Sequence, residues 1–336
     1  MFGVSVPALI GMMNGHGVGD IARDVTAFGF LFMPLVCHHF FQKDARRVYG
    51  FIAVLSVMGI VFAGRGILAS LGLSAGQLDY FSNSPLVLFS FLILFGCSFG
   101  FYCLSARSFG VRVCVALVLL CLSVLPVLAM GLSLQRASLG MVVLGALIIM
   151  VFALRRAPVR AGSLIGSLSL SLVFLFGPWM SDLWLGVLDK TLIYGANQRS
   201  TEMQAVFDAI AGSWAHGAFG LGWGGHFESP AVAGVRVSYT HSFLTSILLK
   251  AGLVGVLIVG VYFFGLITVF RRFVFERLRC SQHDFIRLIV CLAVLFPFVI
   301  ATFFYASYKS LDYGLILLMM VVSGSILRIE TRGAAR

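Results

Sequence analysis

The 336-residue sequence has few charged side chains, and their scarcity excludes most soluble folds. Charged residues make up 11 % of the chain and hydrophobic residues 60 %, whereas a soluble domain carries about 25 % charged residues. Apolar runs long enough to cross a bilayer, roughly 17–25 residues, recur along the whole length. A β-barrel would instead need short alternating segments of about ten residues. With no internal repeat or low-complexity linker, the sequence predicts an all-α, polytopic membrane protein with a single membrane domain, residues 1–336.

Acidic residues are especially scarce, with 13 Asp and Glu against 24 Lys and Arg. In a soluble protein this excess would suggest a nucleic-acid partner. Here the basic residues lie in short connections between apolar runs, where they report topology instead. We therefore expect membrane lipids, and no nucleic acid, around this chain.

The sequence also lacks the patterns that bind metals or nucleotides. No carboxylate and histidine set has metal-ligand spacing, and no Walker or dinucleotide-binding glycine pattern follows a strand. The cysteines show neither a disulfide framework nor a zinc spacing, and we interpret them as small apolar packing residues. No cofactor and no metal is expected. The cysteines are Cys37, Cys97, Cys103, Cys114, Cys121, Cys280 and Cys291.

The apolar runs predict about ten transmembrane helices. Alternate connections hold 16 of the 24 Lys and Arg residues, and the positive-inside rule places that set in the cytoplasm. Both termini are then cytoplasmic. The runs at 50–63 and 139–154 are short, which allows a tilted, broken or re-entrant helix. The predicted spans are 25–41, 50–63, 85–105, 113–134, 139–154, 163–188, 252–270, 285–304 and 313–327, with a poor first span at 2–13 and a polar link ending at Asp24.

One polar stretch, residues 194–242, is long enough to build a site outside the bilayer. It lies in the large predicted periplasmic loop, 189–241. An amphipathic helix is expected near 200–211, with Met203, Val206, Phe207 and Ile210 on one apolar face. The segment that follows has five glycines between 217 and 225, which predicts tight turns and close backbone approach. A helix then restarts after His241.

Three arginines and one histidine could supply a specific chemistry here. Arg136 lies between two apolar spans with almost no loop, and Arg199 and Arg236 lie in the periplasmic loop. Arginine donates two parallel hydrogen bonds to phosphate and keeps its charge, so these residues could hold a diphosphate as it leaves. His241 could accept a proton from an attacking hydroxyl. Such a set transfers a group from a lipid diphosphate without nucleotide or metal.

Each of these residues also has a simpler interpretation. Arg136 could extend to the outer headgroups, as long cationic side chains do near helix ends. The histidines His216 and His226 fit ordinary loop positions. His38 and His39 fit the membrane interface at the cytoplasmic end of a span.

Three stretches of this sequence resemble the O-antigen ligase family, which includes many O-antigen and exopolysaccharide polymerases. The first is LSLQRASLGMVVLGALIIMVFALRR, similar to the family's small-residue turn with an arginine, an apolar span and a basic loop. The second is NQRSTEMQAVFDAI, an arginine opening an amphipathic helix. The third is GLGWGG followed, after a spacer, by THSFLTSILLKAGLVG. The resemblance extends from about Asp24 to Ile326.

The resemblance implies a fold of the membrane glycosyltransferase C type and an undecaprenyl-diphosphate-linked glycan as donor. It also implies a bacterial inner membrane, with catalysis in a periplasmic cavity. The family's histidine, which activates the acceptor hydroxyl, matches His241. Its diphosphate-binding arginines match Arg136 and Arg199, with Arg236 as the competitor of Arg199.

This sequence departs from the family in two motifs and in length. Ser242 follows His241 where the family often has asparagine, and the turn reads Gln135-Arg136-Ala137 where the family often has serine-arginine-glycine. Members usually have about twelve spans, so roughly two are missing at the start.

Several functions remain open. A ligase would use a lipid A core sugar as acceptor, and a polymerase would use a second lipid-linked glycan. A protein hydroxyl is a third acceptor. A polysaccharide transporter or flippase is an alternative from another class, although no repeat of the kind found in many transporters is visible. The last alternative is an inactive structural subunit.

Overall fold

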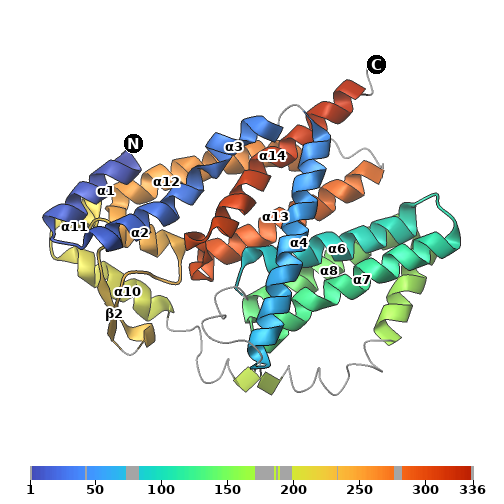
Figure 1. Cartoon of the computed structure of the whole chain (residues 1–336), viewed down its shortest axis with the longest axis horizontal. Coiled ribbons are helices and arrows are strands. Elements are labelled where there is room, and N and C mark those ends of the chain that lie inside the picture. Colours follow the sequence, from blue (N-terminus) through green and yellow to red (C-terminus); the bar gives the residue numbers. More distant parts are fainter. Residues whose placement is uncertain are drawn as a thin grey trace. The chain divides into compact units, whose positions relative to one another are not determined.

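The computed structural model divides into two compact units, which are described separately below (Figure 1). The single membrane domain stays a prediction. The first unit holds residues 1–43, 191–271 and 298–324, and the second holds 44–190, 272–297 and 325–336. The structure describes residues 2–41, 44–72, 83–170, 185–186, 188–189, 199–232, 234–275 and 282–333.

The described residues are almost entirely helical, and seven helical segments are long and apolar enough to cross a membrane. This confirms an all-α, membrane-embedded protein. Most of the predicted span 163–188 lies outside the described residues, so the total of ten spans stays a prediction. The seven segments are Val18–Phe41, Arg46–Ser70, Pro85–Leu104, Phe109–Leu132, Arg136–Arg156, Phe243–Val274 and Asp284–Phe303, and Val4–Met13 and Leu311–Gly324 are shorter apolar helices.

In the second unit, α6 lies at the centre. Its sequence is apolar all round, so it buries every face instead of one stripe. Gly96 packs against the Ile289 side chain of α13, and Gly145 of α8 packs against Leu92, so small residues let these helices approach closely. Both figures show α6 and α7 running side by side. The unit consists of α4 (Ala45–Ser70), α6 (Pro85–Leu104), α7 (Phe109–Leu132), α8 (Arg136–Arg156), a helix at 158–170 and most of α13 (Gln282–Phe303).

The two spans that looked short are in fact long continuous helices. The predicted span 50–63 lies within the 26 residues of α4, and 139–154 lies within the 21 residues of α8. Hydropathy stopped at the flanking arginines, but a helix continues through such residues because their long side chains can reach the interface. A broken or re-entrant path at these two places is therefore wrong.

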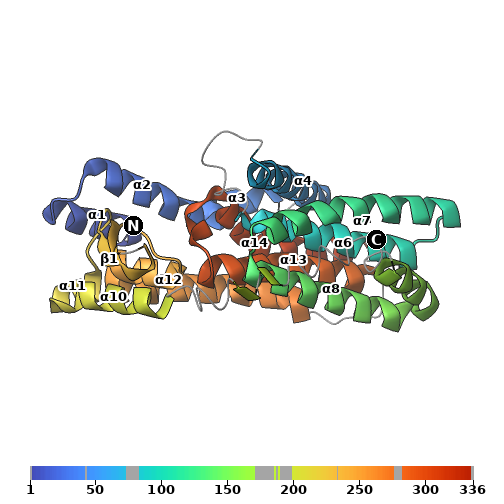
Figure 2. The same ribbon diagram turned by 90° about the horizontal axis from the view of Figure 1, so that it is seen from below.

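The first unit combines helices with a small hairpin. Figure 2 shows β1 beside α10. The two strands pair antiparallel, with Glu228 opposite Arg236. The sequence had not predicted this hairpin. The unit holds α1 (Phe2–Met13), α2 (Val18–Gly29), η1 (Phe30–Phe32), α3 (Met33–Phe41), α10 (Arg199–Ala211), α11 (Trp214–Phe219), β1 (Phe227–Ser229), η2 (Pro230–Val232), β2 (Val235–Val237), most of α12 (Phe243–Phe275), η3 (Ala306–Lys309) and most of α14 (Leu311–Gly333).

The glycine-rich segment, residues 217–225, packs against a kink in α12. Gly252 has a φ of 64°, outside helical geometry, and a Cβ there would come within 2.4 Å of the Ala218 backbone. The kink leaves two carbonyls of α12 without an amide partner inside the helix, and amides of the glycine-rich segment donate to them. The Leu221 amide donates to the Leu249 carbonyl at 2.8 Å, and the Gly222 amide donates to the Lys250 carbonyl at 3.0 Å. The predicted close backbone approach is confirmed.

The predicted loop helix is present as α10. Val206 and Ile210 of the predicted apolar face are buried, and Met203 and Phe207 are about half exposed. Glu202 is buried together with Val206 and Ile210, so the side of α10 that packs on the rest of the unit also carries a carboxylate.

Candidate active site

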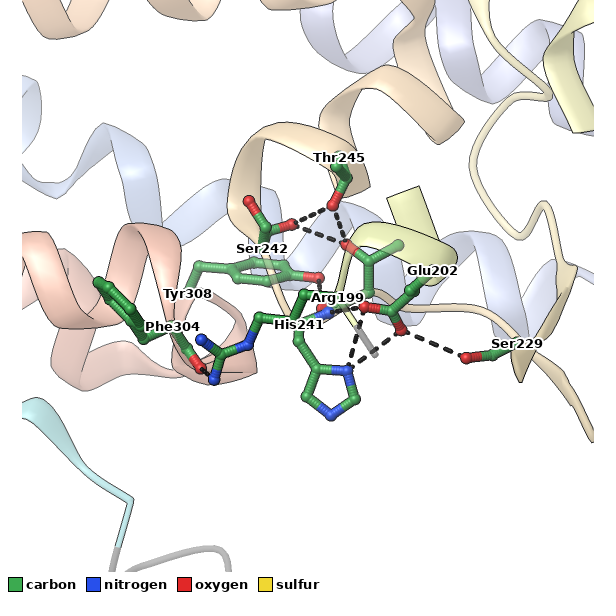
Figure 3. A network of polar contacts seen from close by, with 9 residues as sticks. Arg199, Glu202, Ser229, His241, Ser242, Thr245, Phe304 and Tyr308 are labelled. Atoms are coloured by element: carbon green, nitrogen blue, oxygen red, sulfur yellow. Dashed lines mark hydrogen bonds and ion pairs between the residues drawn. The ribbon is translucent and has the colours of Figure 1, made fainter. Parts of the chain in front are cut away.

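The site is built around Glu202, whose carboxylate meets His241 twice. The Nδ1 atom of His241 lies 3.1 Å from both carboxylate oxygens, and the His241 backbone amide donates to Oε2 at 3.0 Å. In Figure 3 the imidazole turns Nδ1 toward Glu202, and its other ring nitrogen points away from this network. An Nδ1–H that donates to a carboxylate leaves Nε2 as the proton acceptor of a neutral imidazole.

The environment keeps Glu202 ionised. Burial alone would raise the pKa of its carboxyl group. The hydrogen bonds from the His241 side chain and amide and from the Ser229 hydroxyl lower it, and the net pKa is below its usual range. The Ser229 hydroxyl donates to Oε1 at 3.3 Å. The carboxylate is therefore a fixed negative acceptor, and the imidazole that it orients is 35 % exposed at its side chain.

The segment that carries His241 is held from the other side by η3. The Tyr308 hydroxyl donates to the Thr240 carbonyl at 3.0 Å, and Tyr308 and Thr240 are both buried. The Thr240 hydroxyl also lies 2.7 Å from that of Thr245, in the first turn of α12. With Glu202 bonded to the backbone of His241, the ring has a fixed support on both sides (Figure 3).

Arg199 lies one helical turn from Glu202 on α10. Residues three apart on a helix are neighbours on its surface, so Arg199 and the carboxylate share one side of the helix. The guanidinium Nη2 donates to the Phe304 carbonyl at 2.9 Å, and its carbon lies 5.1 Å from the centre of the Phe304 ring. Arg199 is the first residue of α10, where the backbone N–H groups also favour an anion.

Arg236 lies on the hairpin, on the face opposite to the Glu202 contact. Directly paired residues of two antiparallel strands share a face, and successive residues alternate. Arg236 pairs with Glu228, and both are exposed, whereas the neighbouring Ser229 is buried against Glu202. Between the two competing loop arginines, the geometry favours Arg199 as the neighbour of His241.

Arg136 lies in the second unit, directly after a strained turn. Leu134 has a φ of 48°, in the left-handed region. Its amide donates to the Gly131 carbonyl, and the Gln135 amide donates to the Met130 carbonyl. These two bonds make the motif that often ends a helix with glycine, and a non-glycine residue there costs roughly 1–2 kcal/mol. The turn fixes half-buried Arg136 as the first residue of α8.

A second charged cluster lies on α2 and α12, and the sequence had missed it. The Asp24 carboxylate lies 2.6 Å from the Lys250 ammonium and accepts the Gly224 amide at 2.9 Å. The Lys250 ammonium also donates to the Gly225 carbonyl at 2.6 Å. The polar link predicted to end at Asp24 is wrong, because α2 begins at Val18 and carries Asp24 inside it. A charged residue fits within this helix because Lys250 neutralises it.

The histidines that were interpreted as loop residues lie outside the Glu202 network. His216 lies on α11, and the ring of His226 lies 6.3 Å from that of His16. Burial lowers the pKa of His226, with a smaller contribution from the charge of Lys250. In the part of the chain that the structure describes, no group of three or more His, Cys, Asp or Glu side chains gathers as a metal site.

Comparison with known proteins adds no identification. No protein-family model, no curated protein and no solved structure matches this chain.

Proposed function

We propose that this chain is a membrane glycosyltransferase of the O-antigen ligase type. It would move a glycan from an undecaprenyl-diphosphate donor to an acceptor hydroxyl at the periplasmic face, with no nucleotide. The observation that carries the proposal is the Glu202–His241 pair, a partly exposed imidazole fixed by a buried carboxylate. This is the arrangement a general base requires, since the second group sets the tautomer and the direction of the free nitrogen.

The reaction follows from the residues in their places. Nε2 of His241 takes the proton of the acceptor hydroxyl as its oxygen attacks the anomeric carbon of the donor sugar. The bond between that carbon and the diphosphate breaks, and the electron pair leaves on undecaprenyl diphosphate. Arg199 offsets the growing negative charge, an effect that is largest where charge develops. The Glu202 carboxylate stabilises the imidazolium until its proton is released.

In this proposal Arg136 is the second residue that binds the diphosphate. The assignment rests on the resemblance of its motif to that of the family. Its support in the structure is local. Strained backbone persists where the surroundings fix it, and such places cluster at functional sites. The strained Leu134 turn sets the start of α8 and with it the position of Arg136.

Transfer by the purified protein tests the proposal. The protein in detergent receives undecaprenyl-diphosphate glycan from its host and an acceptor, without nucleotide and with a chelator. Product on lipid A core identifies a ligase, and a ladder of longer lipid-linked chains identifies a polymerase of the same family. No product with any acceptor would contradict the proposal and favour a transporter.

The first prediction concerns the base itself. His241→Ala lowers the transfer rate by roughly 10²–10⁴-fold, the usual contribution of a general base. His216→Ala is the matched control, a histidine of the same unit outside the Glu202 network, and it keeps the wild-type rate. Full activity in His241→Ala, with normal expression and folding, would remove His241 from the mechanism.

A further inference from the structure

A small cleft, with a cavity volume of about 30 Å³, lies next to the candidate active site, within the first unit. One side is a face of α2 and η1 that runs from Asp24 to Leu31, and the other is a face of α12 that runs from Phe243 to Lys250. On each helix the lining residues recur at i, i+3, i+4 and i+7, so each helix presents one continuous stripe. The stripes are mostly apolar, and the cationic groups Lys250 and Lys309 also line the cleft.

The two lysines of this cleft are not equivalent. The Lys250 ammonium is neutralised, because Asp24 lies 2.6 Å away and the Gly225 carbonyl accepts its other hydrogen bond. Lys309 makes no ion pair with any carboxylate of the described residues, and its ammonium lies 4.0 Å from the centre of the Tyr239 ring. Burial lowers the pKa of Lys309 to about 7, with Asp24 raising it and Lys250 and Arg23 lowering it further. Among the described residues, no carboxylate contacts this amine to keep it charged.

Lys309 also lies close to the proposed base. The Tyr239 ring that receives its ammonium has its centre 6.2 Å from the centre of the His241 ring, so the ammonium lies at most about 10 Å from the imidazole. A base lies about 2.6–3.2 Å from the hydroxyl oxygen it deprotonates, and reacting atoms approach to about 3–3.5 Å. The diphosphate begins one bond beyond the anomeric carbon. A cation within about 10 Å of the imidazole can therefore reach a phosphate oxygen of the donor.

We propose that Lys309 binds a phosphate group of the lipid-linked donor. The inference rests on the proposed function. Charge complementarity selects the occupant, since no carboxylate of the described residues pairs with Lys309 and a phosphate supplies that anion. The donor phosphate restores the charge of Lys309, as a phosphate and an ammonium form a charge-assisted hydrogen bond.

Binding of undecaprenyl diphosphate to the purified protein in nanodiscs tests this assignment. Lys309→Met keeps the aliphatic part of the side chain and weakens binding by about 10- to 100-fold. Lys309→Arg keeps the charge and restores binding. Arg271→Met is the matched control: it removes an exposed cation near the other end of α12, and binding stays at the wild-type level.

The pH dependence adds a readout that a purely structural role would not give. The amine of the free protein loses its proton as the pH rises through about 7. Wild-type affinity therefore falls between pH 6 and pH 8 more steeply than that of Lys309→Arg, whose guanidinium stays charged. Titration of the diphosphate itself is common to both proteins and cancels in the comparison. Equal slopes would overturn the proposal.

Two further binding measurements identify the source of the phosphate. Phosphatidylglycerol that binds with the same dependence on Lys309, or pyrophosphate alone that competes as well as the lipid, would overturn the assignment to the donor. Wild-type affinity in Lys309→Met would overturn it too. His241→Ala separates this inference from the proposed function. That variant binds the lipid without transferring it, and transfer by it would contradict the function whatever Lys309 does.

Discussion

Two pairs in the first unit each join a buried carboxylate to a basic side chain. They differ in whether that side chain keeps an exposed nitrogen that does not contact the carboxylate. Asp24 and Lys250 form a closed pair, because the ammonium is 2 % exposed at its side chain and both partners have backbone contacts as well. Glu202 and His241 form an open pair, because the imidazole is 35 % exposed and one nitrogen turns away from the carboxylate (Figure 3).

The difference separates stability from chemistry. A closed pair ties α2 to α12 and to the glycine-rich turn through the bonds of Asp24 and Lys250 to Gly224 and Gly225. An open pair holds its base in one orientation and leaves that base able to take a proton. We expect substitutions in the closed pair to act on folding, and substitutions in the open pair to act on transfer.

The largest effect on stability is expected from Asp24→Asn. It leaves the Lys250 ammonium buried without its counter-ion, and breaking such a pair costs about 3–5 kcal/mol. Thermal unfolding in detergent measures the loss.

The double variant Asp24→Asn with Lys250→Gln sharpens this test. The amides can still bond to Gly224 and Gly225, and no charge stays buried, so stability recovers much of the loss. A single variant as stable as the wild type would mean that the pair is not closed.

The next effect separates the two loop arginines. Arg199→Lys replaces a planar fork by a point charge and lowers the transfer rate by about tenfold or more, since a charged hydrogen bond contributes roughly 1.5–3 kcal/mol. Arg236→Lys changes the rate little, because Arg236 lies on the hairpin face away from Glu202. The opposite order in a transfer assay would make Arg236 the loop arginine of the site.

The smallest effect is a pH dependence of stability. The pKa of Glu202 is below its usual range in the folded protein, so its contribution is present above the unfolded value of about 4.3 and is lost as the pH falls through the folded value. Unfolding of wild type and Glu202→Gln should therefore differ at pH 7 and converge in acid. A difference that grows toward low pH would contradict the ionised carboxylate.

Much of the fold follows from local pattern in the sequence. Apolar runs predicted the long helices, and an apolar face predicted α10, because both signals lie within a few turns of chain. The arginines near the ends of α4 and α8 made the predicted spans too short, since hydropathy counts their charge and not their long apolar stems.

The pairings within the site could not be found in the same way. Glu202 and His241 are 39 residues apart, and Asp24 and Lys250 come from two separate segments of the unit, 1–43 and 191–271. No local period reports such contacts. His241 could be proposed because its residue type and its place before a helix matched a family motif. Glu202 looked like an ordinary polar residue of an amphipathic helix. The only available signal was an acid on a helix face that is otherwise apolar at Val206 and Ile210.

The transfer rate of Glu202→Gln at saturating donor is the most direct test of the open pair. The account predicts a loss that is a large part of the roughly 10²–10⁴-fold contribution of the base, while the folded fraction stays near that of the wild type. His216→Ala, the matched control from the same unit, should keep the wild-type rate. Wild-type turnover in Glu202→Gln would contradict the claim that this carboxylate sets His241 for proton transfer.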